Sequence, residues 1–286
     1  MDAVVDGQIQ KSGGKIRVTL RMVRVADGAP LWSSQYDEKA TDIFTVQDSI
    51  SERVVGVLAL RLSSEEKERL TNRHTDNTEV YQLYMLGRFH FARRTKAAIS
   101  KSIAYYEQAI EKDPHYALAY AALAASYSAS GWYGFLPPQQ AYTKAKEAAT
   151  KALEIDSTVA EARPVLGNVK RSYDWDWAGS ESEYKRAIEL DPNYATAYHW
   201  YGDHLAYLGR FDESNALFKR AQELDPVSLI INSSIGDTLL LARRYDQAIE
   251  QYQRVLQMDP VSRRLTLTLA KPIFVRTTIR KPCRSC

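Results

Sequence analysis

Aspartate–proline pairs that recur at a fixed interval constrain this chain more than any other feature of its sequence. The pairs end at Pro114, Pro192, Pro226 and Pro260, a related EIDS ends at Ser157, and the last three pairs lie 34 residues apart. A residue before proline is driven out of the helical region, so a helix has to end there. Proline fits the first turn of the next helix, which the aspartate can cap. The spacing therefore predicts an array of similar helical units.

Two columns of residues inside the units predict how the helices of each pair pack. The units begin at Val80, Ala117, Ala160, Ala195 and Leu229. The eighth position of each unit is small, and a position in its second helix mostly holds a ring. The small column comprises Gly87, Ala124, Gly167, Gly202 and Gly236, and the ring column comprises Tyr106, Ala149, Tyr184, Phe218 and Tyr252. In each unit the residue four positions before the ring column is small, and the residue three positions after it is small in most units. These spacings place all three positions on one face of the second helix.

The matches across these five units resemble the tetratricopeptide repeat family over residues 80–262. The resemblance implies a mainly α fold, a right-handed α-solenoid of helix–turn–helix repeats in which each repeat buries its apolar face against its neighbours. It also implies that the first helices line a concave groove, that this groove binds a protein or peptide, and that the repeats catalyse no reaction.

Two units are longer than the repeat requires. The first has about three extra residues near RRTKAA, and the second has about nine, GWYGFLPPQ at 131–139. Glycine and the proline pair predict that 131–139 form a loop between the two helices. The rings of this loop, Trp132, Tyr133 and Phe135, either contact a partner or fold back onto the ridge of the solenoid. The second interpretation fits the rarity of large exposed apolar clusters.

Residues 1–71 show a different pattern, that of a small α+β piece. Segment 15–22 alternates apolar and polar residues, as a half-buried strand does. Residues 3–10 and 31–36 are two further candidate strands, and glycine-containing turns join them to the first one. A helix is expected from about residue 42 to 62, and a second helix from Ser63, which has capping-box spacing to an acidic residue.

This amino-terminal run resembles the later half of the TolB-like amino-terminal domain over residues 3–71, with 72–79 as a linker to the repeats. Such a domain often stands directly before tetratricopeptide repeats in bacterial regulators, and a winged-helix, kinase or cyclase module frequently precedes it. The resemblance implies a fragment of a larger bacterial signalling or transcriptional regulator. The alternative is the regulatory part of an enzyme, a kinase or cyclase, whose catalytic module lies outside this chain.

The net charge of +3 arises at one end of the chain. Residues 263–286 hold seven basic residues and no acidic residue, so residues 1–262 carry a net charge of −4. The body therefore gives no electrostatic reason to expect nucleic acid, and only this irregular basic tail leaves that partner open. The tail is interpreted either as a truncated or out-of-register end or as a genuine segment that is disordered or binds an acidic partner.

The sequence lacks the residues that several classes of function require. Cys283 and Cys286 form a single CxxC without the further ligands of a zinc site. His199 and His204 are five residues apart, so they do not share a helix face as metalloprotease histidines do. No apolar run is long enough to span a bilayer, and no signal peptide is recognisable. We therefore expect a non-catalytic, cytoplasmic protein with no cofactor, metal or small-molecule substrate.

The candidate binding residues lie on the first helices, at positions that usually point into the groove of such repeats. They are Tyr81, Tyr84, Arg88, Phe91, Asn168, Arg171, His199, Asp203, Tyr207, Ser233 and Asp237. This surface is aromatic at one end and polar at the other, which suits an extended peptide or a partner helix. The lysine–asparagine pattern with which some family members clamp a terminal carboxylate is absent, so we do not predict that ligand.

The stretch DWDW at 174–177 has the appearance of a small binding site, but the repeat accounts for most of it. Trp177 occupies a position that holds a ring in four of the five units, so it is expected to be structural. Asp174 or Asp176 lies where the second helix of the unit needs a cap. Trp175 shares its position with Gly209 of the next unit, and the repeat does not require an indole there.

Overall fold

The computed structural model describes residues 3–12, 15–39 and 75–258. The chain divides into two compact units, Met1–Met85 and Leu86–Cys286. The helices expected within residues 42–71 and the basic tail at 263–286 lie outside the described residues, so those expectations stay predictions. The proposed domain boundaries likewise stay predictions.

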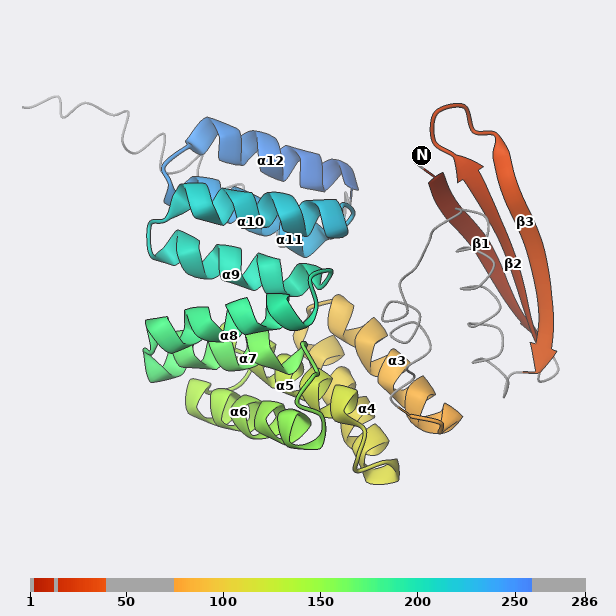
Figure 1. The fold of residues 1–286 in the computed structure, drawn as a ribbon, viewed down its shortest axis with the longest axis horizontal. Coiled ribbons are helices and arrows are strands. Elements are labelled where there is room, and N and C mark those ends of the chain that lie inside the picture. The colour runs from red at the N-terminus through yellow and green to blue at the C-terminus, as the bar shows by residue number, and fades with distance from the viewer. Residues whose placement is uncertain (1–2, 13–14, 40–74, 259–286) are drawn as a thin grey trace, which may run out of the picture. The chain divides into compact units, whose positions relative to one another are not determined.

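The first unit contains a three-stranded antiparallel sheet in the order β1-β2-β3 (Figure 1). The strands are β1 (Ala3–Ser12), β2 (Lys15–Arg24) and β3 (Pro30–Lys39). Each predicted strand is present and longer than its sequence pattern indicated. A tight turn joins β2 to β3, in which the N–H of Gly28 bonds the carbonyl of Arg24 at 2.9 Å and Gly28 has a φ of 68°. Glycine adopts this left-handed conformation without steric cost.

The two faces of the sheet differ as the alternating pattern of β2 predicts. Val18, Met22 and Trp32 are buried on one face, and Met22 lies opposite Trp32 in the register of β2 and β3. The other face carries ion pairs between exposed side chains, for example Arg21 with Asp6 at 2.6 Å. Exposed ion pairs contribute at most about 1 kcal/mol each, so the apolar face accounts for most of the stability of the sheet.

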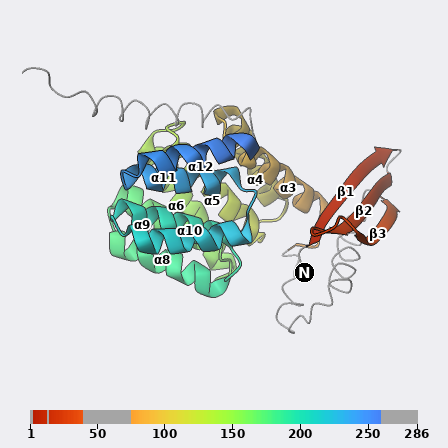
Figure 2. The same ribbon diagram turned by 90° about the horizontal axis from the view of Figure 1, so that it is seen from above.

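Ten α-helices and one π-helical turn follow among the described residues, and α5 to α12 form successive antiparallel hairpins (Figure 1). They are α3 (Thr78–Ala92), α4 (Lys96–Lys112), α5 (Ala117–Trp132), α6 (Pro138–Ile155), α7 (Ala162–Val169), η1 (Lys170–Asp174), α8 (Trp177–Leu190), α9 (Ala195–Tyr207), α10 (Phe211–Leu224), α11 (Leu229–Leu241) and α12 (Tyr245–Met258). Within the second unit, α9 packs against α10, and α11 packs against α12 (Figure 2). The expected mainly α array with a small amino-terminal sheet is confirmed.

The small and ring columns meet inside the hairpins, as their spacing predicts. A Cβ atom added to Gly167 would lie 2.8 Å from the ring of Tyr184, and one added to Gly202 would lie 3.1 Å from the ring of Phe218. Gly236 faces Tyr252 in the same way, at a still closer approach. These rings are almost wholly buried and have nowhere to move. Where a ring faces it, the eighth position therefore has to be glycine so that the two helices of a repeat can touch. In the second repeat, Ala149 replaces the ring and Ala124 replaces the glycine.

A serine on the second helix adds a recurring polar contact to the same junction. The hydroxyl of Ser180 donates to the carbonyl of Gly167, and that of Ser214 donates to the carbonyl of Gly202, both at 2.8 Å. Both serines are fully buried. Because each buried hydroxyl has an acceptor, the small column of the second helix accommodates serine as well as alanine.

The predicted loop at 131–139 is shorter in the structure, and this corrects its assignment. Helix α5 continues through Gly131 and Trp132, and α6 already begins at Pro138. Only residues 133–137 connect the two helices. The extra length of this repeat is used mainly to lengthen α5 and α6, so Trp132 is a helix residue. Tyr133 and Phe135 contact each other across the short connection, with ring centroids 5.5 Å apart.

A π-helical turn, η1, interrupts the first helix of the third repeat and was not predicted. This repeat is one residue longer than those after it, since Ser157 and Pro192 lie 35 residues apart. A π-turn accommodates one extra residue in a helix without breaking it. The extra residue therefore explains the turn, and the turn contains Arg171.

The residues of DWDW have different structural roles. Asp176 caps α8 by accepting a hydrogen bond from the Gly179 N–H at 2.8 Å, whereas Asp174 forms an ion pair with Lys146 at 2.8 Å. Trp177 begins α8 and lies 5.7 Å from the His204 ring, between centroids, as expected of a structural ring. Trp175 is 73% exposed.

The position of Trp175 is left-handed in three successive repeats. Trp175 has a φ of 57°, Gly209 one of 75° and Arg243 one of 60°. In each case the N–H of the following residue bonds a carbonyl near the end of the first helix at 2.9 Å. This is the geometry of a helix carboxyl-terminal cap, which favours glycine. Nothing in the structure requires an indole at this cap.

We expect the change Trp175→Gly to stabilise the protein by about 0.5–1 kcal/mol, because it relieves the left-handed conformation at the loss of little packing. Urea unfolding followed by circular dichroism measures this. Conversely, Gly209→Ala in the next repeat should destabilise the protein by a similar amount. No atom lies within 4 Å of a Cβ added at Gly209, so only the left-handed backbone conformation disfavours alanine there. Destabilisation by Trp175→Gly would contradict the assignment of Trp175 as a cap without a packing role.

Candidate binding groove

Two adjoining cavities lie on the inner helices of the second unit, α5, α7, α9 and α11, which pack against one another in that order. The first has a volume of about 60 Å³, and residues including Trp132, Asn168, Arg171, His199, Asp203 and Ser234 line it. The second has a volume of about 50 Å³, and residues including Trp132, Asp203, Tyr207, Ser234 and Asp237 line it. We call this surface the groove. The shared residues Trp132, Asp203 and Ser234 make it continuous.

Arg171 is the central charge of the groove. Its guanidinium carbon lies 5.4 Å from the centre of the Trp132 ring and 5.2 Å from the centre of the Tyr207 ring. These two rings also contact each other, with centroids 6.2 Å apart in an edge-on arrangement. Attraction between the cation and the two aromatic rings holds the guanidinium in place. Trp132 and Tyr207 are both about half exposed, so the rings form the rim of the groove.

A short chain of hydrogen bonds holds the guanidinium group of Arg171 in place. Its Nη2 donates to Oδ1 of Asn168 at 2.6 Å, and Nδ2 of Asn168 donates to the hydroxyl of Ser128 at 2.7 Å. All three residues are buried. Asn168 belongs to α7 and Ser128 to α5, so the chain links two repeats at the point where the guanidinium sits. The side-chain orientation of Arg171 is therefore set before any ligand arrives.

A second polar group joins α9 to α11. Nε2 of His199 lies 2.8 Å from the hydroxyl of Ser234 and 3.4 Å from a carboxylate oxygen of Asp203. His199 and Ser234 are buried, whereas the Asp203 side chain keeps 25% exposure. Asp203 therefore presents a carboxylate at the surface of the groove. Together with burial, it raises the pKa of the nearby Tyr207 hydroxyl, and burial is the larger cause.

Six of the predicted residues line the groove: Asn168, Arg171, His199, Asp203, Tyr207 and Asp237. Asp237 also accepts a hydrogen bond from the Tyr252 hydroxyl at 2.6 Å. This contact couples the groove to the core of the last hairpin.

The other predicted residues lie outside the cavity lining. Ser233 is not part of the lining, and its hydroxyl donates to the Leu229 carbonyl of its own helix at 2.5 Å. Its neighbour Ser234 lines both cavities instead. Phe91 lies under the Arg94 guanidinium at 3.7 Å, and Arg94 rather than Phe91 reaches the first cavity. Arg88 is exposed and also outside the lining. Tyr81 and Tyr84 fall in the other compact unit, and Tyr84 is buried there.

Ser128 and Ser234 are groove residues that the sequence pattern did not identify, and Trp132 was considered as a partner contact only as part of a loop. Trp132 lies beyond the standard repeat length, within the segment expected to be a loop. Ser234 is one position away from the expected position. The aromatic character of the GWYGF segment was the one available signal for Trp132, since rings near a groove mouth are typical of recognition surfaces.

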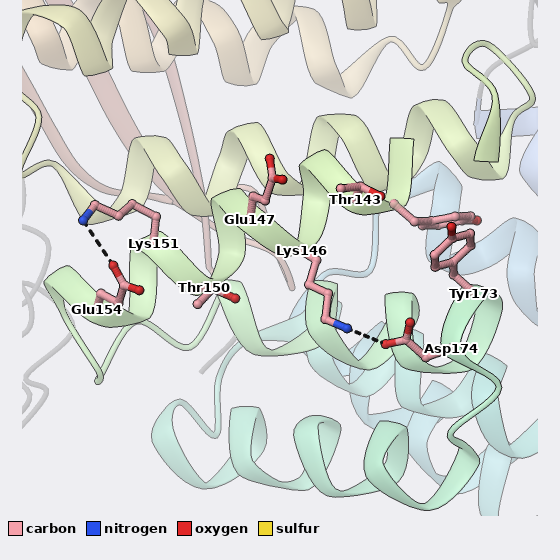
Figure 3. A pocket seen from close by; sticks show the side chains of 9 residues that line it. Thr143, Lys146, Glu147, Thr150, Lys151, Glu154, Tyr173 and Asp174 are labelled. Carbon is pink, nitrogen blue, oxygen red and sulfur yellow. Dashed lines mark hydrogen bonds and ion pairs between the residues drawn. The ribbon is translucent and has the colours of Figure 1, made fainter. Parts of the chain in front are cut away.

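A larger hollow, of about 560 Å³, lies on α6 and η1, away from the groove, and Figure 3 shows its lining. Lys146 pairs with Asp174, and Lys151 pairs with Glu154 at 3.1 Å (Figure 3). These charges are largely exposed and already paired with one another. Because both of its lysines are already paired and its walls are open to solvent, the hollow is a weaker candidate than the groove despite its size.

His204 lies behind the groove on the buried side of α9, so His199 and His204 face different surroundings, as their spacing predicts. It is fully buried among Trp177, Tyr184 and Tyr201, and its Nδ1 lies 3.3 Å from the hydroxyl of Ser180. Burial, and secondarily the positive charge of Arg171, lower the pKa of His204 to about 4. The ring is therefore neutral at physiological pH and packs as a core residue.

We expect the stability of the protein to fall as pH drops from 6.5, the ordinary pKa of histidine, towards the folded-state pKa of His204 near 4. Between these two pH values, His204 binds a proton in the unfolded chain but not in the folded chain. The free energy of unfolding therefore falls by at most about 1.4 kcal/mol per pH unit. Urea unfolding at several pH values measures the slope. His204→Asn should reduce it, whereas His115→Asn, an exposed histidine, should leave it unchanged. A His204 ring that titrates near 6.5 by NMR would contradict this account.

Two negative findings concern the described residues alone. Within residues 3–12, 15–39 and 75–258, no group of three or more metal-ligating side chains comes together. In the same residues, no helix combines the length and apolar character that crossing a membrane requires.

Comparison with known proteins identifies repeats in the carboxyl-terminal part of the helical array. Residues 176–228 and 202–263 match the family described as Tetratricopeptide repeat. Among solved structures, TTC0263, a thermophilic tetratricopeptide-repeat protein of Thermus thermophilus, has a TM-score of 0.56 and 20% sequence identity, and the match covers 68% of this chain and 99% of that chain. This likeness concerns the fold, and it supports a tetratricopeptide-like helical array.

Two curated relatives are larger than this chain. "Putative adenylate cyclase 3" of Rhizobium meliloti (strain 1021) is 30% identical over 166 residues, which are 57% of this chain and 28% of the relative. The transcriptional regulator HilA of Salmonella typhimurium (strain LT2) is 26% identical over 217 residues, which are 74% of this chain and 38% of the relative. The chain therefore spans about a third of the curated relatives that it matches.

Proposed function

We propose that this chain is a non-catalytic protein-interaction scaffold that binds a peptide or a segment of a partner protein in the groove. The observation that carries the proposal is the placement of Arg171, a buried cation that stands between two half-exposed rings and is held by side chains from two repeats. Trp, Tyr and Arg are the residues that contribute most to protein–protein recognition. Small cavities beside them suit side chains of a ligand.

We further propose that the scaffold belongs to a larger bacterial signalling or transcriptional regulator. The names of the curated relatives, a cyclase and a transcriptional regulator, and the share of their length that this chain spans support this. The resemblance of residues 3–71 to a TolB-like domain points the same way. The second candidate is the regulatory part of an enzyme, a kinase or cyclase, with its catalytic module outside this chain, and the relative named as a cyclase favours it.

A comparative pull-down tests the scaffold function. Immobilised wild-type protein is compared with the double variant Arg171→Glu, His199→Ala, and bound proteins are identified by mass spectrometry. The matched control, Lys146→Glu with His115→Ala, carries the same types of change outside the groove. We expect the groove variant to lose a partner that the wild type and the control retain, while circular dichroism shows all three folded. Equal retention by folded groove variant and control would reject the proposal.

A further inference from the structure

The groove holds a positive charge, the guanidinium of Arg171, that forms no ion pair with any of the described residues. Arg171 is only 7% exposed, and its Nη1 is a buried donor without a hydrogen-bond partner in the described part of the chain. Its Nη2 bonds the neutral amide of Asn168. Buried guanidinium groups are usually paired, because an uncompensated charge away from water is costly. An acceptor from outside the chain that reaches this donor would offset the cost of its burial.

A negative charge faces the same cavity. Asp203 lines the first cavity together with Arg171, yet no ion pair forms between them in the described structure. The ion-pair contact of Asp203 is with Nε2 of His199 at 3.4 Å, and that nitrogen has a closer partner in the Ser234 hydroxyl at 2.8 Å. Asp203 also lines the second cavity, so its carboxylate lies where the two cavities join. Two further charged residues of the groove have contacts of their own, Arg94 with the Phe91 ring and Asp237 with the Tyr252 hydroxyl. Arg171 and Asp203 thus form a separated pair of opposite charges in the first cavity.

A single carboxylate is a poor match for this arrangement. It would satisfy Nη1 of Arg171 but would be repelled by Asp203 in the same cavity, where screening by water is reduced. A ligand with opposite charges in the complementary order meets both groups favourably. In an extended peptide, side chains two residues apart lie on the same face, so they can supply such a pair to one cavity. The rings of Trp132 and Tyr207 would shield the contact from solvent.

We propose that the groove recognises an acidic side chain of the partner at Nη1 of Arg171 and a neighbouring basic side chain at Asp203. The carboxylate accepts a charge-assisted hydrogen bond from the unpartnered guanidinium nitrogen, and the ammonium or guanidinium group pairs with the exposed face of the Asp203 carboxylate. The partner segment is thus distinguished by charges of opposite sign two residues apart on one face of an extended chain. This inference rests on the proposed function, since it names the chemistry that the groove selects.

The test uses the full chain and capped peptides at millimolar concentration, followed by NMR of the tryptophan indole N–H signals. The probe, called the Glu-Lys peptide, is acetyl-Ala-Glu-Ala-Lys-Ala-Ala-amide, in which Glu and Lys share one face of an extended chain. Three matched peptides replace Glu by Gln, Lys by norleucine, or both. A fourth, acetyl-Ala-Gln-Ala-norleucine-Ala-Ala with a free carboxyl terminus, presents a terminal carboxylate instead. The Trp132 signal, assigned by Trp132→Phe, reports on the groove, and the Trp175 signal serves as the reference outside it.

We expect the Glu-Lys peptide to shift the Trp132 signal and leave the Trp175 signal in place. Replacing Glu by Gln should weaken its affinity about tenfold or more, and replacing Lys by norleucine should weaken it to a smaller extent. In the protein, Arg171→Gln should remove the preference for Glu, and Asp203→Asn should remove the preference for Lys. Lys146→Gln, outside the groove, should change neither preference.

Three results would overturn the inference: no Trp132 shift with the Glu-Lys peptide, equal affinity for the uncharged peptide, or tighter binding of the free-terminus peptide. Because the peptide substitutions are tested on wild-type protein, instability of Arg171→Gln cannot hide these outcomes. If the peptides fail while the groove variant still loses its partner in the pull-down, the scaffold function stands and only the charge-pair chemistry falls. If the peptides fail and the groove variant also keeps every partner in the pull-down, the groove is rejected as the binding surface.

Discussion

Replacing Tyr184 by alanine is expected to lower the free energy of unfolding by about 3–5 kcal/mol, the usual cost of deleting a large buried ring. Tyr184 is fully buried, and its ring packs against Gly167 within its own repeat. It also stacks on Tyr201 of the next repeat, with centroids 5.9 Å apart. No small movement fills the space that it leaves, because the helices already touch at the glycine. The loss should appear in the midpoint of urea unfolding.

The matched control for this prediction is Tyr173→Ala in the same repeat. Tyr173 is 37% exposed, and its ring contacts Tyr142 at a centroid distance of 5.9 Å. We expect its removal to cost less than about 1 kcal/mol, in the range of surface substitutions. Similar losses for the two variants would mean that the ring column does not hold the repeats together.

The second large effect concerns binding. Trp132→Ala is expected to weaken the affinity for the partner by about 2 kcal/mol, roughly 30-fold in Kd, as for a central aromatic residue of an interface. The indole contacts both Arg171 and Tyr207, so its loss removes contact area and also opens the guanidinium to water. Isothermal titration calorimetry with the partner recovered from the pull-down measures the change.

Trp175→Ala provides the same chemical change outside the groove. Its indole is 73% exposed and sits at the carboxyl-terminal cap of the preceding helix. Binding should be unaffected by this substitution. If Trp175→Ala weakens binding while Trp132→Ala does not, the partner contacts the surface around Trp175 rather than the groove.

The packing of the repeats could be predicted from sequence because it repeats. The contact of Gly236 with Tyr252 follows from the same columns as that of Gly167 with Tyr184, and each repeat supports the assignment of the others. A fixed period converts one weak pattern into several consistent observations. The sheet was predictable for a related reason, since β2 alternates over its whole length and only one register buries Val18 and Met22.

The details of the groove were less predictable, because they depend on departures from the period. One extra residue in the third repeat can be absorbed at many places, and the sequence does not show that it forms the π-turn around Arg171. In the last repeat, one position of error turns a helix face by about 100°, enough to exchange Ser233 for Ser234. Trp132 lay in an extension for which the other repeats have no counterpart.

Site-specific photo-cross-linking tests the central claim, that the groove is the binding surface, most directly. A benzophenone amino acid replaces Tyr207 at the rim of the groove or Tyr173 beside the larger hollow, and the full chain is irradiated with the purified partner. The account predicts a cross-linked product from position 207, its loss when Arg171→Gln is added, and little product from position 173. A product from position 173 alone, or one from 207 that survives Arg171→Gln unchanged, would contradict it.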